Sequence, residues 1–183
     1  MSTIKTTNIT HGSNSGTANV VLDSSGNATI NGNITGTGGI YLGGTGSANF
    51  FNDYEEGTFT PILTGSTWSY SAQAGYYVKI GKLCWATVKV TWSTAANSGN
   101  FGVDDLPFNS SSDSNIKACV NIGYCTQMHR GAAGDEQLVG VLGDSDNAIS
   151  VFRLTHLNTP NTEANSDVGD NGEFQCSIMY KTA

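Results

Sequence analysis

The sequence predicts an all-β protein in two parts, a fibrous β-repeat stalk followed by a β-sandwich head that is jelly-roll-like. Three observations lead to this prediction. Segments 20–30 and 40–50 repeat one another with a period of 20 residues. The composition changes sharply near residue 52. After that point, short β-branched and aromatic segments alternate with long loops rich in Ser, Gly, Asn and Asp, which is typical of sandwiches and jelly rolls.

Each copy of the repeat reads as apolar alternation, a glycine-bearing turn and apolar alternation again, which predicts a short β-hairpin. The matching positions are Val20/Ile40, Leu22/Leu42, Gly26/Gly46, Ala28/Ala48 and Ile30/Phe50. One hairpin has a single thin apolar stripe and cannot bury it alone. Because two copies are too few for a solenoid of one chain, we expect several identical chains to wrap around a common axis as an intertwined fibre.

The segment that contains the repeat has an unusual composition. Residues 1–52 carry only two charged side chains, Lys5 and Asp23, beside ten glycines and no proline. Disordered tails are usually rich in charge and proline, so this composition favours a fibrous segment. The polar lead before the repeat is expected to become ordered when another protein captures it. The expected divisions are an attachment segment, a repeat stalk and a head, at residues 1–19, 20–52 and 53–183.

The head is expected to contain eight strands with no substantial helix. Their ranges are 58–63, 66–70, 75–80, 83–92, 117–127, 137–142, 149–156 and 173–181. The last is the clearest, because Phe174, Cys176 and Ile178 alternate with polar residues.

Charge and hydropathy exclude several partners. The 183-residue chain has a net charge of −7, which falls on the head because Lys5 and Asp23 cancel. The eight Lys and Arg residues are scattered, so nucleic acid is not an expected partner. No apolar stretch approaches ~18 residues, so no membrane insertion is expected. The N-terminus lacks the apolar core of a signal peptide, which indicates folding in a cytoplasm.

The four cysteines show no C-x-x-C pairing; they are Cys84, Cys119, Cys125 and Cys176. We expect buried, reduced thiols packed in strands, because free Cys behaves as a small hydrophobe. A disulfide is the alternative, but it lacks a secretory context. Zinc would require close Cys or His pairs.

Two pairs of adjacent carboxylates, Glu55–Glu56 and Asp104–Asp105, are the candidates for catalysis. A glycosidase needs two carboxylates that converge across a sugar at ~5–10 Å. Neighbours on an extended chain point to opposite faces, so neither pair supplies this geometry. We therefore expect no enzyme, and no catalytic, cofactor-binding or metal-binding residue.

The acidic segments 144–147 and 167–173 are expected to be ordinary turns. Calcium accepts oxygen ligands at such places, so binding at Asp144 and Asp146, or at Asp167 and Asp170, stays open as an alternative. The spacing of an EF-hand fails because Gly169 occupies the third position of the second segment.

The remaining candidates for ligand binding are histidines and aromatic residues. His129–Arg130 lies in an expected loop, where an exposed loop is favoured over a ligand site, and His11 and His156 have no partner spacing. Five aromatic residues are candidates for stacking on sugars, although core or interface anchoring is favoured. They are Trp68, Tyr70, Tyr76, Tyr77 and Trp92.

Three motifs carry a resemblance to a known family. Residues 53–61 read D-Y-E-E-G-T-F-T-P, residues 70–81 fit Y-x-x-Q-x-G-x-Y-x-K-I-G, and residues 106–108 read L-P-F. In this order they resemble the C-terminal domain of fibre and minor structural proteins of tailed bacteriophages, especially phages of marine bacteria and cyanobacteria. The resemblance covers residues 50–112.

The resemblance implies a virion structural protein that is assembled in the host cytoplasm as a homotrimer. One end is expected to attach to another virion protein, and the head to adhere to a glycan or protein of the host surface. The expected contact loops are 93–100, 109–115, 128–136 and 158–172. The alternative is a capsid decoration or head-fibre protein with a purely structural or stabilising role. An enzyme that acts on host polysaccharide is disfavoured.

Overall fold

The computed structural model describes residues 6–12, 16, 18–65, 67–95, 98–112, 117–128, 137–154 and 160–183. The chain divides into two compact units, Met1–Phe50 and Phe51–Ala183. In the part that is described, the only helical segments are two 3-10 turns, η1 (Ser47–Asn49) and η2 (Asn165–Asp167). Among these residues no helix is long and apolar enough to cross a membrane. The all-β prediction is confirmed.

The first unit contains small antiparallel sheets. Their strands are β1 (Asn8–Ile9), β2 (Val20–Leu22), β3 (Ala28–Ile30), β4 (Ile40–Tyr41) and β5 (Phe50–Phe51). β2 pairs with β3, and β4 pairs with β5, so both copies of the repeat form the predicted hairpins. The first turn is closed by Asp23, whose Oδ1 accepts the backbone N–H groups of Ser25 and Asn27. β1, which the sequence did not predict, pairs with β2.

These hairpins have hydrogen bonds but no core within one chain. None of the described residues between 6 and 50 is buried. The apolar side chains of Leu22, Ile30, Ile40 and Leu42 are exposed. Because exposed apolar area contributes nothing to stability, this unit needs a further surface to become stable.

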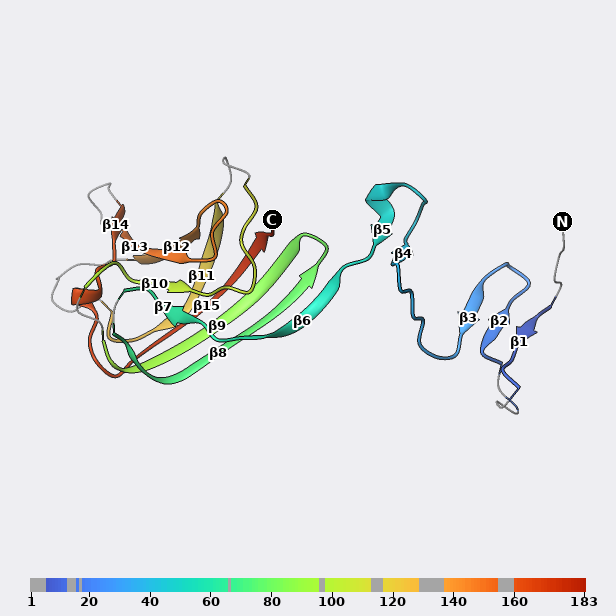
Figure 1. The fold of residues 1–183 in the computed structure, drawn as a ribbon, viewed down its shortest axis with the longest axis horizontal. Helices are drawn as coiled ribbons and strands as arrows, with labels where there is room; N and C mark the ends of the chain where they lie inside the picture. Colours follow the sequence, from blue (N-terminus) through green and yellow to red (C-terminus); the bar gives the residue numbers. More distant parts are fainter. Residues whose placement is uncertain are drawn as a thin grey trace. The chain divides into compact units, whose positions relative to one another are not determined.

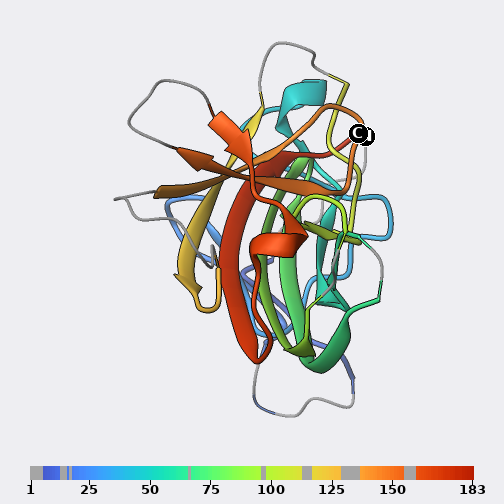
Figure 2. The same ribbon diagram turned by 90° about the vertical axis from the view of Figure 1, so that its left-hand side faces the viewer.

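The second unit consists of one antiparallel ten-stranded sheet. Its strands are β6 (Tyr54–Phe59), β7 (Ile62–Leu63), β8 (Ser69–Ile80), β9 (Leu83–Thr94), β10 (Gly102–Asp104), β11 (Ala118–Cys125), β12 (Gln137–Leu142), β13 (Ile149–Leu154), β14 (Pro160–Thr162) and β15 (Gly172–Lys181). The order is β6-β8-β9-β15-β11-β12-β13-β10-β7, with β14 added beside β13. The sheet curls until β12 and β13 lie over the long curved strands β8, β9 and β15 (Figures 1 and 2). The two layers expected of a sandwich are therefore halves of one sheet.

The edges of this sheet come from one short segment. β6 and β7 are two residues apart in sequence but occupy opposite ends of the sheet order. Pro61, which is fully buried, lies between them and has no N–H to donate to a ladder. Its carbonyl accepts Nε2 of Gln73, and the Leu63 N–H donates to Tyr70 Oη. The prediction of a single strand at 58–63 is therefore wrong, because the chain passes there from one edge of the sheet to the other.

Other strand predictions differ in extent. The segments 66–70 and 75–80 are joined in the single strand β8, whose register is irregular between Ser69 and Ala72. The polar residues Ser71 and Gln73 interrupt the apolar pattern, because this part of the strand is partly solvated. The sequence therefore did not predict that the two segments form one strand. β10 and β14 are only three residues each and were not predicted.

Two glycines allow close contacts between β6 and β8. Gly75 lies opposite Phe59, and a Cβ there would come within 2.6 Å of the Phe59 ring. Gly57 lies opposite Tyr77, and a Cβ there would come within 2.9 Å of the Tyr77 ring. Each ring thus covers a glycine on the neighbouring strand, which explains why this part of the motif needs glycine.

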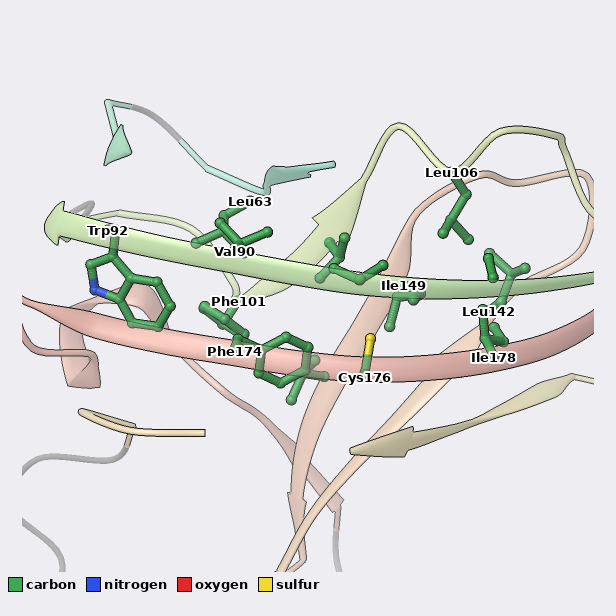
Figure 3. Close-up of a cluster of buried hydrophobic side chains, with 14 of the residues drawn as sticks. Leu63, Val90, Trp92, Phe101, Leu106, Leu142, Ile149, Phe174, Cys176 and Ile178 are labelled. Carbon is green, nitrogen blue, oxygen red and sulfur yellow. The ribbon is translucent and has the colours of Figure 1, made fainter. Parts of the chain in front are cut away.

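The core lies between the two layers of the curled sheet (Figure 3). Along β15, buried and more exposed residues alternate as predicted, with Phe174, Cys176 and Ile178 inside. Phe101 joins the layers, because its ring centroid lies 5.3 Å from that of Phe174 and 6.0 Å from that of Trp92.

Replacement of this central ring should destabilise the second unit strongly. We expect Phe101→Ala to lower the free energy of unfolding by ~3–5 kcal/mol, because it leaves a cavity that the surrounding rings cannot fill. Urea denaturation followed by tryptophan fluorescence measures this loss. The matched control is Tyr124→Ala at an exposed strand position, with a change within about 0.5 kcal/mol. Equal midpoints for the two variants would show that Phe101 is not central.

Candidate functional site

The outer face of the sheet formed by β6, β8, β9, β15 and β11 is the candidate functional site. Residues alternate along β9, so that Val88 and Val90 are buried while Thr87 and Lys89 face outward. The register places Tyr76 opposite Thr87, and Thr87 opposite Ser177. Ser177 in turn lies opposite Asn121. One row of the outer face therefore runs Tyr76–Thr87–Ser177–Asn121 across four strands.

A groove of about 440 Å³ crosses this row. The polar lining side chains are those of Tyr76, Thr87, Lys89, Asn121, Gln175 and Ser177. The ladder between β11 and β15 shifts register between Ile122 and Tyr124, where Gly123 is the intervening residue. A Cβ at Gly123 would meet nothing within 4 Å, so the bulge leaves the groove open on this side.

A polar network borders the groove. Glu173 lies 3.2 Å from Lys89 Nζ, and its carboxylate also accepts Nε2 of Gln175. Hydrogen bonds hold the pKa of Glu173 below its usual value; the bond from Gln175 has the largest effect, and the bond from Lys89 the next. These contacts fix the positions of Lys89 and Gln175, whose polar groups line the groove.

The arrangement is suited to binding a polar, ring-shaped ligand. Tyr76 is 60% exposed and stands beside hydroxyl and amide side chains. An aromatic face stacks on the apolar C–H face of a sugar, while amide and hydroxyl groups satisfy its hydroxyls. Among the described lining residues there is no carboxylate.

The other aromatic candidates serve the fold. Trp92 is 1% exposed and donates its Nε1–H to the Gly169 carbonyl, so it is not available for stacking on a ligand. Trp68 packs edge-on against Trp92 at 5.4 Å. Tyr70 binds the Leu63 N–H, and Tyr77 donates to Glu55. These four residues are core anchors, one of the two roles that the favoured prediction allowed, whereas Tyr76 is exposed.

The paired carboxylates do not converge. Glu55 accepts the hydroxyl of Tyr77, whose ring packs at 5.2 Å against Phe108 on the inner side. Glu56 accepts the hydroxyl of Tyr54 instead. Asp104 caps the N–H of Asp105. Glu55 and Glu56 therefore have different partners, as expected of neighbours that point to opposite faces of a strand.

The acidic segments form turns and loop contacts. Asp146 Oδ1 accepts the N–H groups of Asn147 and Ala148. Asp170 Oδ1 accepts the N–H of Ala95. Across the described ranges, no group of three or more His, Cys, Asp or Glu side chains is arranged to hold a metal ion.

The expected contact loops are only partly described. His129, Arg130, His156 and most of 128–136 lie outside the described residues. Within 158–172, Asn165 is fully buried and donates Nδ2 to the carbonyls of Thr64 and Ser98. This part of the loop therefore holds the fold together, contrary to the expectation of a free contact loop.

A buried charged cluster was missed by the sequence analysis. Glu163 is fully buried, and Arg153 Nη1 lies 3.9 Å from it and 3.8 Å from Asp167. The backbone of Glu163 also bonds to Phe101 and Val151. The spacing of residues in the sequence does not predict this cluster, because its members belong to different elements. It joins β13 to the segment that follows β14, which is a structural role.

All four cysteines are free in the structure. Cys84 and Cys176 are buried as predicted, Cys125 is half-buried, and Cys119 is exposed, contrary to the prediction. Burial raises the pKa of Cys84 and raises that of Cys176 to about 12. Burial raises the pKa of Cys125 as well, and the Glu163 charge adds to the increase.

Comparison with known proteins gives one informative likeness. No protein-family profile matches the chain, and no curated protein sequence matches it. Among solved structures, the chain is similar to the Dettilon tailspike protein (gp208), with a TM-score of 0.60 and 19% identity. The similarity covers 71% of this chain and 24% of that one, so the chain spans about a quarter of the tailspike's length. At this identity the likeness shows a shared fold.

The buried thiols give a prediction about alkylation. Burial raises the pKa of Cys176 from 9.0 to about 12, so we expect it to stay an unreactive thiol as the pH rises past 9. We expect iodoacetamide to leave Cys84 and Cys176 unlabelled in the native protein at pH 9. Mass spectrometry of the denatured, non-reduced protein should give four labels per chain. Fewer than four would mean that a disulfide forms, and rapid native labelling of Cys176 would contradict its burial.

Proposed function

We propose that this chain is a structural protein of a bacteriophage virion, a tail-associated fibre whose head, residues 53–183, adheres to the host-cell surface. The likeness to a tailspike protein supports the virion setting. The motifs at 53–61, 70–81 and 106–108, which resemble those of phage fibre proteins, also support it.

The observation that carries the adhesive role is the groove around Tyr76. It combines an exposed aromatic ring with Asn121, Gln175 and Ser177 on a rigid sheet. Strands hold such groups more firmly than loops do, which lowers the entropy lost on binding. The ligand of this groove is a saccharide of the host surface. The role proposed for this groove is binding of the saccharide.

A single shallow site of this kind binds weakly. Several copies on one fibre, and several fibres on one particle, raise the overall avidity by ~10²–10⁴ without new contacts. Weak binding at each site is therefore sufficient for attachment, and it lets the particle move between neighbouring receptors.

The repeat supplies the multivalency. In this proposal residues 20–52 of three chains intertwine into a stalk, and residues 1–19 attach to another virion protein. The support is that none of the described residues between 6 and 50 is buried in one chain, so the hairpins need other chains to bury Leu22 and Leu42.

Competition for host cells tests the adhesive role. The purified full chain should block adsorption of the phage to the bacterium that it infects. Tyr76→Ala removes the stacking ring and should raise the half-blocking concentration by about tenfold, which corresponds to ~1.4 kcal/mol. Gly123→Phe should have a similar effect, because its ring projects into the open side of the groove.

The control for both variants is Tyr124→Ala, which removes another exposed ring, outside the groove. Adsorption that is insensitive to excess wild-type protein would contradict the adhesive role. If virions without the protein also infect normally but lose particle stability, the capsid decoration role replaces it.

The stalk has its own test. Leu22→Asp combined with Leu42→Asp should dissociate the assembly, because each change loses ~1.5–3 kcal/mol of apolar burial per chain. Light scattering should show three chains of 19.1 kDa for the wild type and smaller species for the variant. Ser24→Asp with Thr45→Asp, which places the same charges in the turns, is the matched control. A stable, folded wild-type monomer at micromolar concentration would refute the stalk.

A further inference from the structure

A second hollow in the second unit lies where β15 ends and β11 begins. Its volume is about 420 Å³. The side chains that matter for its chemistry are those of Leu83, Lys117, Cys119, Met179 and Lys181. The described residues that line this hollow do not overlap with those that line the groove around Tyr76. The two are therefore separate sites.

Strand alternation brings these side chains to one face of the sheet. Along β15, Met179 and Lys181 are exposed, whereas Tyr180 between them is buried. Leu83 at the start of β9 lies directly opposite Lys181. Side chains directly opposite on one sheet face are about 4.5–5.5 Å apart at Cβ, so an apolar and a cationic side chain are neighbours here. Cys119 occupies an exposed position on β11.

Hydrogen bonds hold one wall of the hollow in place. The Ser111 N–H donates to the Lys181 carbonyl at 2.8 Å, and Ser110 forms an isolated β-bridge with Thr182. The Ser110 hydroxyl donates to the Gly143 carbonyl at 2.6 Å. These bonds join the segment before β11 to the end of β15 and to the turn after β12. The hollow is therefore preformed, which lowers the entropy lost when a ligand binds.

Part of the lining is apolar and adaptable. Leu83 is 47% exposed and Met179 57% exposed, although both side chains are large and apolar. Covering them with an apolar group removes this surface from water, which is favourable. The unbranched Met side chain adapts to the shape of what it contacts. The volume of the hollow is within the ~300–1,000 Å³ that is typical of small-molecule sites.

The charged part of the lining is cationic. Lys117 and Lys181 are both exposed and border the hollow, and none of its described lining residues is acidic. In a chain with a net charge of −7 and only eight Lys and Arg residues, this is a local reversal of charge that favours an anion. The adjacent Asp146 directs Oδ1 to the N–H groups of its own turn.

Lys117 is the stronger candidate to hold an anion. The ion pairs among the described residues do not include it. Lys181 also takes part in a contact within the chain, so we assign it a supporting role. A Lys ammonium is a point charge with three rotatable donors, which binds a carboxylate or a phosphate without requiring a fixed geometry.

We propose that this hollow binds a small amphipathic anion, with its apolar part against Leu83 and Met179 and its carboxylate or phosphate at Lys117. The ligand is a free small molecule, in agreement with the volume of the hollow. The proposal concerns a different surface from the groove around Tyr76 and does not depend on adhesion to the host. A failure of the adsorption test therefore leaves it standing.

Alkylation of Cys119 measures whether the hollow is occupied, because this free thiol is exposed and lines it. In the purified full chain, millimolar sodium octanoate should slow the labelling of Cys119 by iodoacetamide several-fold and in a saturable way. Mass spectrometry of the peptides gives the rate for each cysteine. Cys176 should stay unlabelled throughout, which shows that octanoate does not unfold the protein. An unchanged rate at Cys119 would overturn the proposal.

Related probes separate the apolar and the charged contributions. Octyl phosphate should protect Cys119 as octanoate does, octanol should require a several-fold higher concentration, and octylammonium should not protect. Shorter carboxylates should bind more weakly, by up to about fourfold for each CH₂ removed. Equal protection by octanol and octanoate would contradict the role of the lysines. Protection by anionic phospholipid vesicles but not by octanoate would assign the hollow to a membrane surface and overturn the proposal.

Substitution at the cation tests where the anion lies. Lys117→Gln should raise the half-protecting concentration of octanoate several-fold and leave that of octanol unchanged. Lys117→Arg is the matched control, because it keeps the charge and should retain most of the affinity. Both changes are at an exposed position and should leave the fold intact. If Lys117→Gln binds octanoate as the wild type does, the anion is not held there and the proposal is wrong.

Discussion

The fold of the second unit depends on one constraint: residues 54–63 must supply both edges of a single sheet. β6 and β7 are separated by two residues, yet they terminate the sheet at opposite ends. A flat sheet of this order would place its ends far apart, because neighbouring strands are ~4.8 Å apart. The sheet therefore has to curl until its ends meet, and the curl brings Phe101 and Leu142 over Phe174 and Ile178 to form the core.

Residues of the motifs that resemble those of phage fibre proteins lie where the two ends of the curled sheet meet. Tyr70 and Gln73 bond to the backbone on either side of the edge change, and Gly57 and Gly75 lie under aromatic rings. Phe108 packs against Tyr77 and accepts the Tyr180 hydroxyl at its carbonyl. These motif residues face inward or hold the backbone, so the pattern marks a way of folding. A fold shared with a tailspike protein at 19% identity agrees with this interpretation.

Periodicity in the sequence was sufficient to predict the regular strands. It was not sufficient to predict how the sheet curls until its ends meet. The alternation along β15 and the repeat hairpins could be predicted because they depend on local patterns. The edge change at Pro61 and the cluster of Glu163 with Arg153 depend on residues far apart in sequence. Among the aromatic candidates, Tyr76 and Tyr77 are adjacent and chemically alike. Only the strand register decides that Tyr77 faces Phe108 and Tyr76 faces the groove.

The residues of the outer face can differ between this protein and others whose sheet curls in the same way. Tyr76 and Val78 fall at open positions of the motif, and Trp85 lies outside it. Along β9, Trp85 and Thr87 are two residues apart, which is ~6.6 Å on a strand. Trp85 and the groove residue Thr87 thus lie in adjacent rows of one face. Any partner packed over Trp85 would form a wall beside the groove, so its binding and that of a groove ligand would be coupled through the same strands.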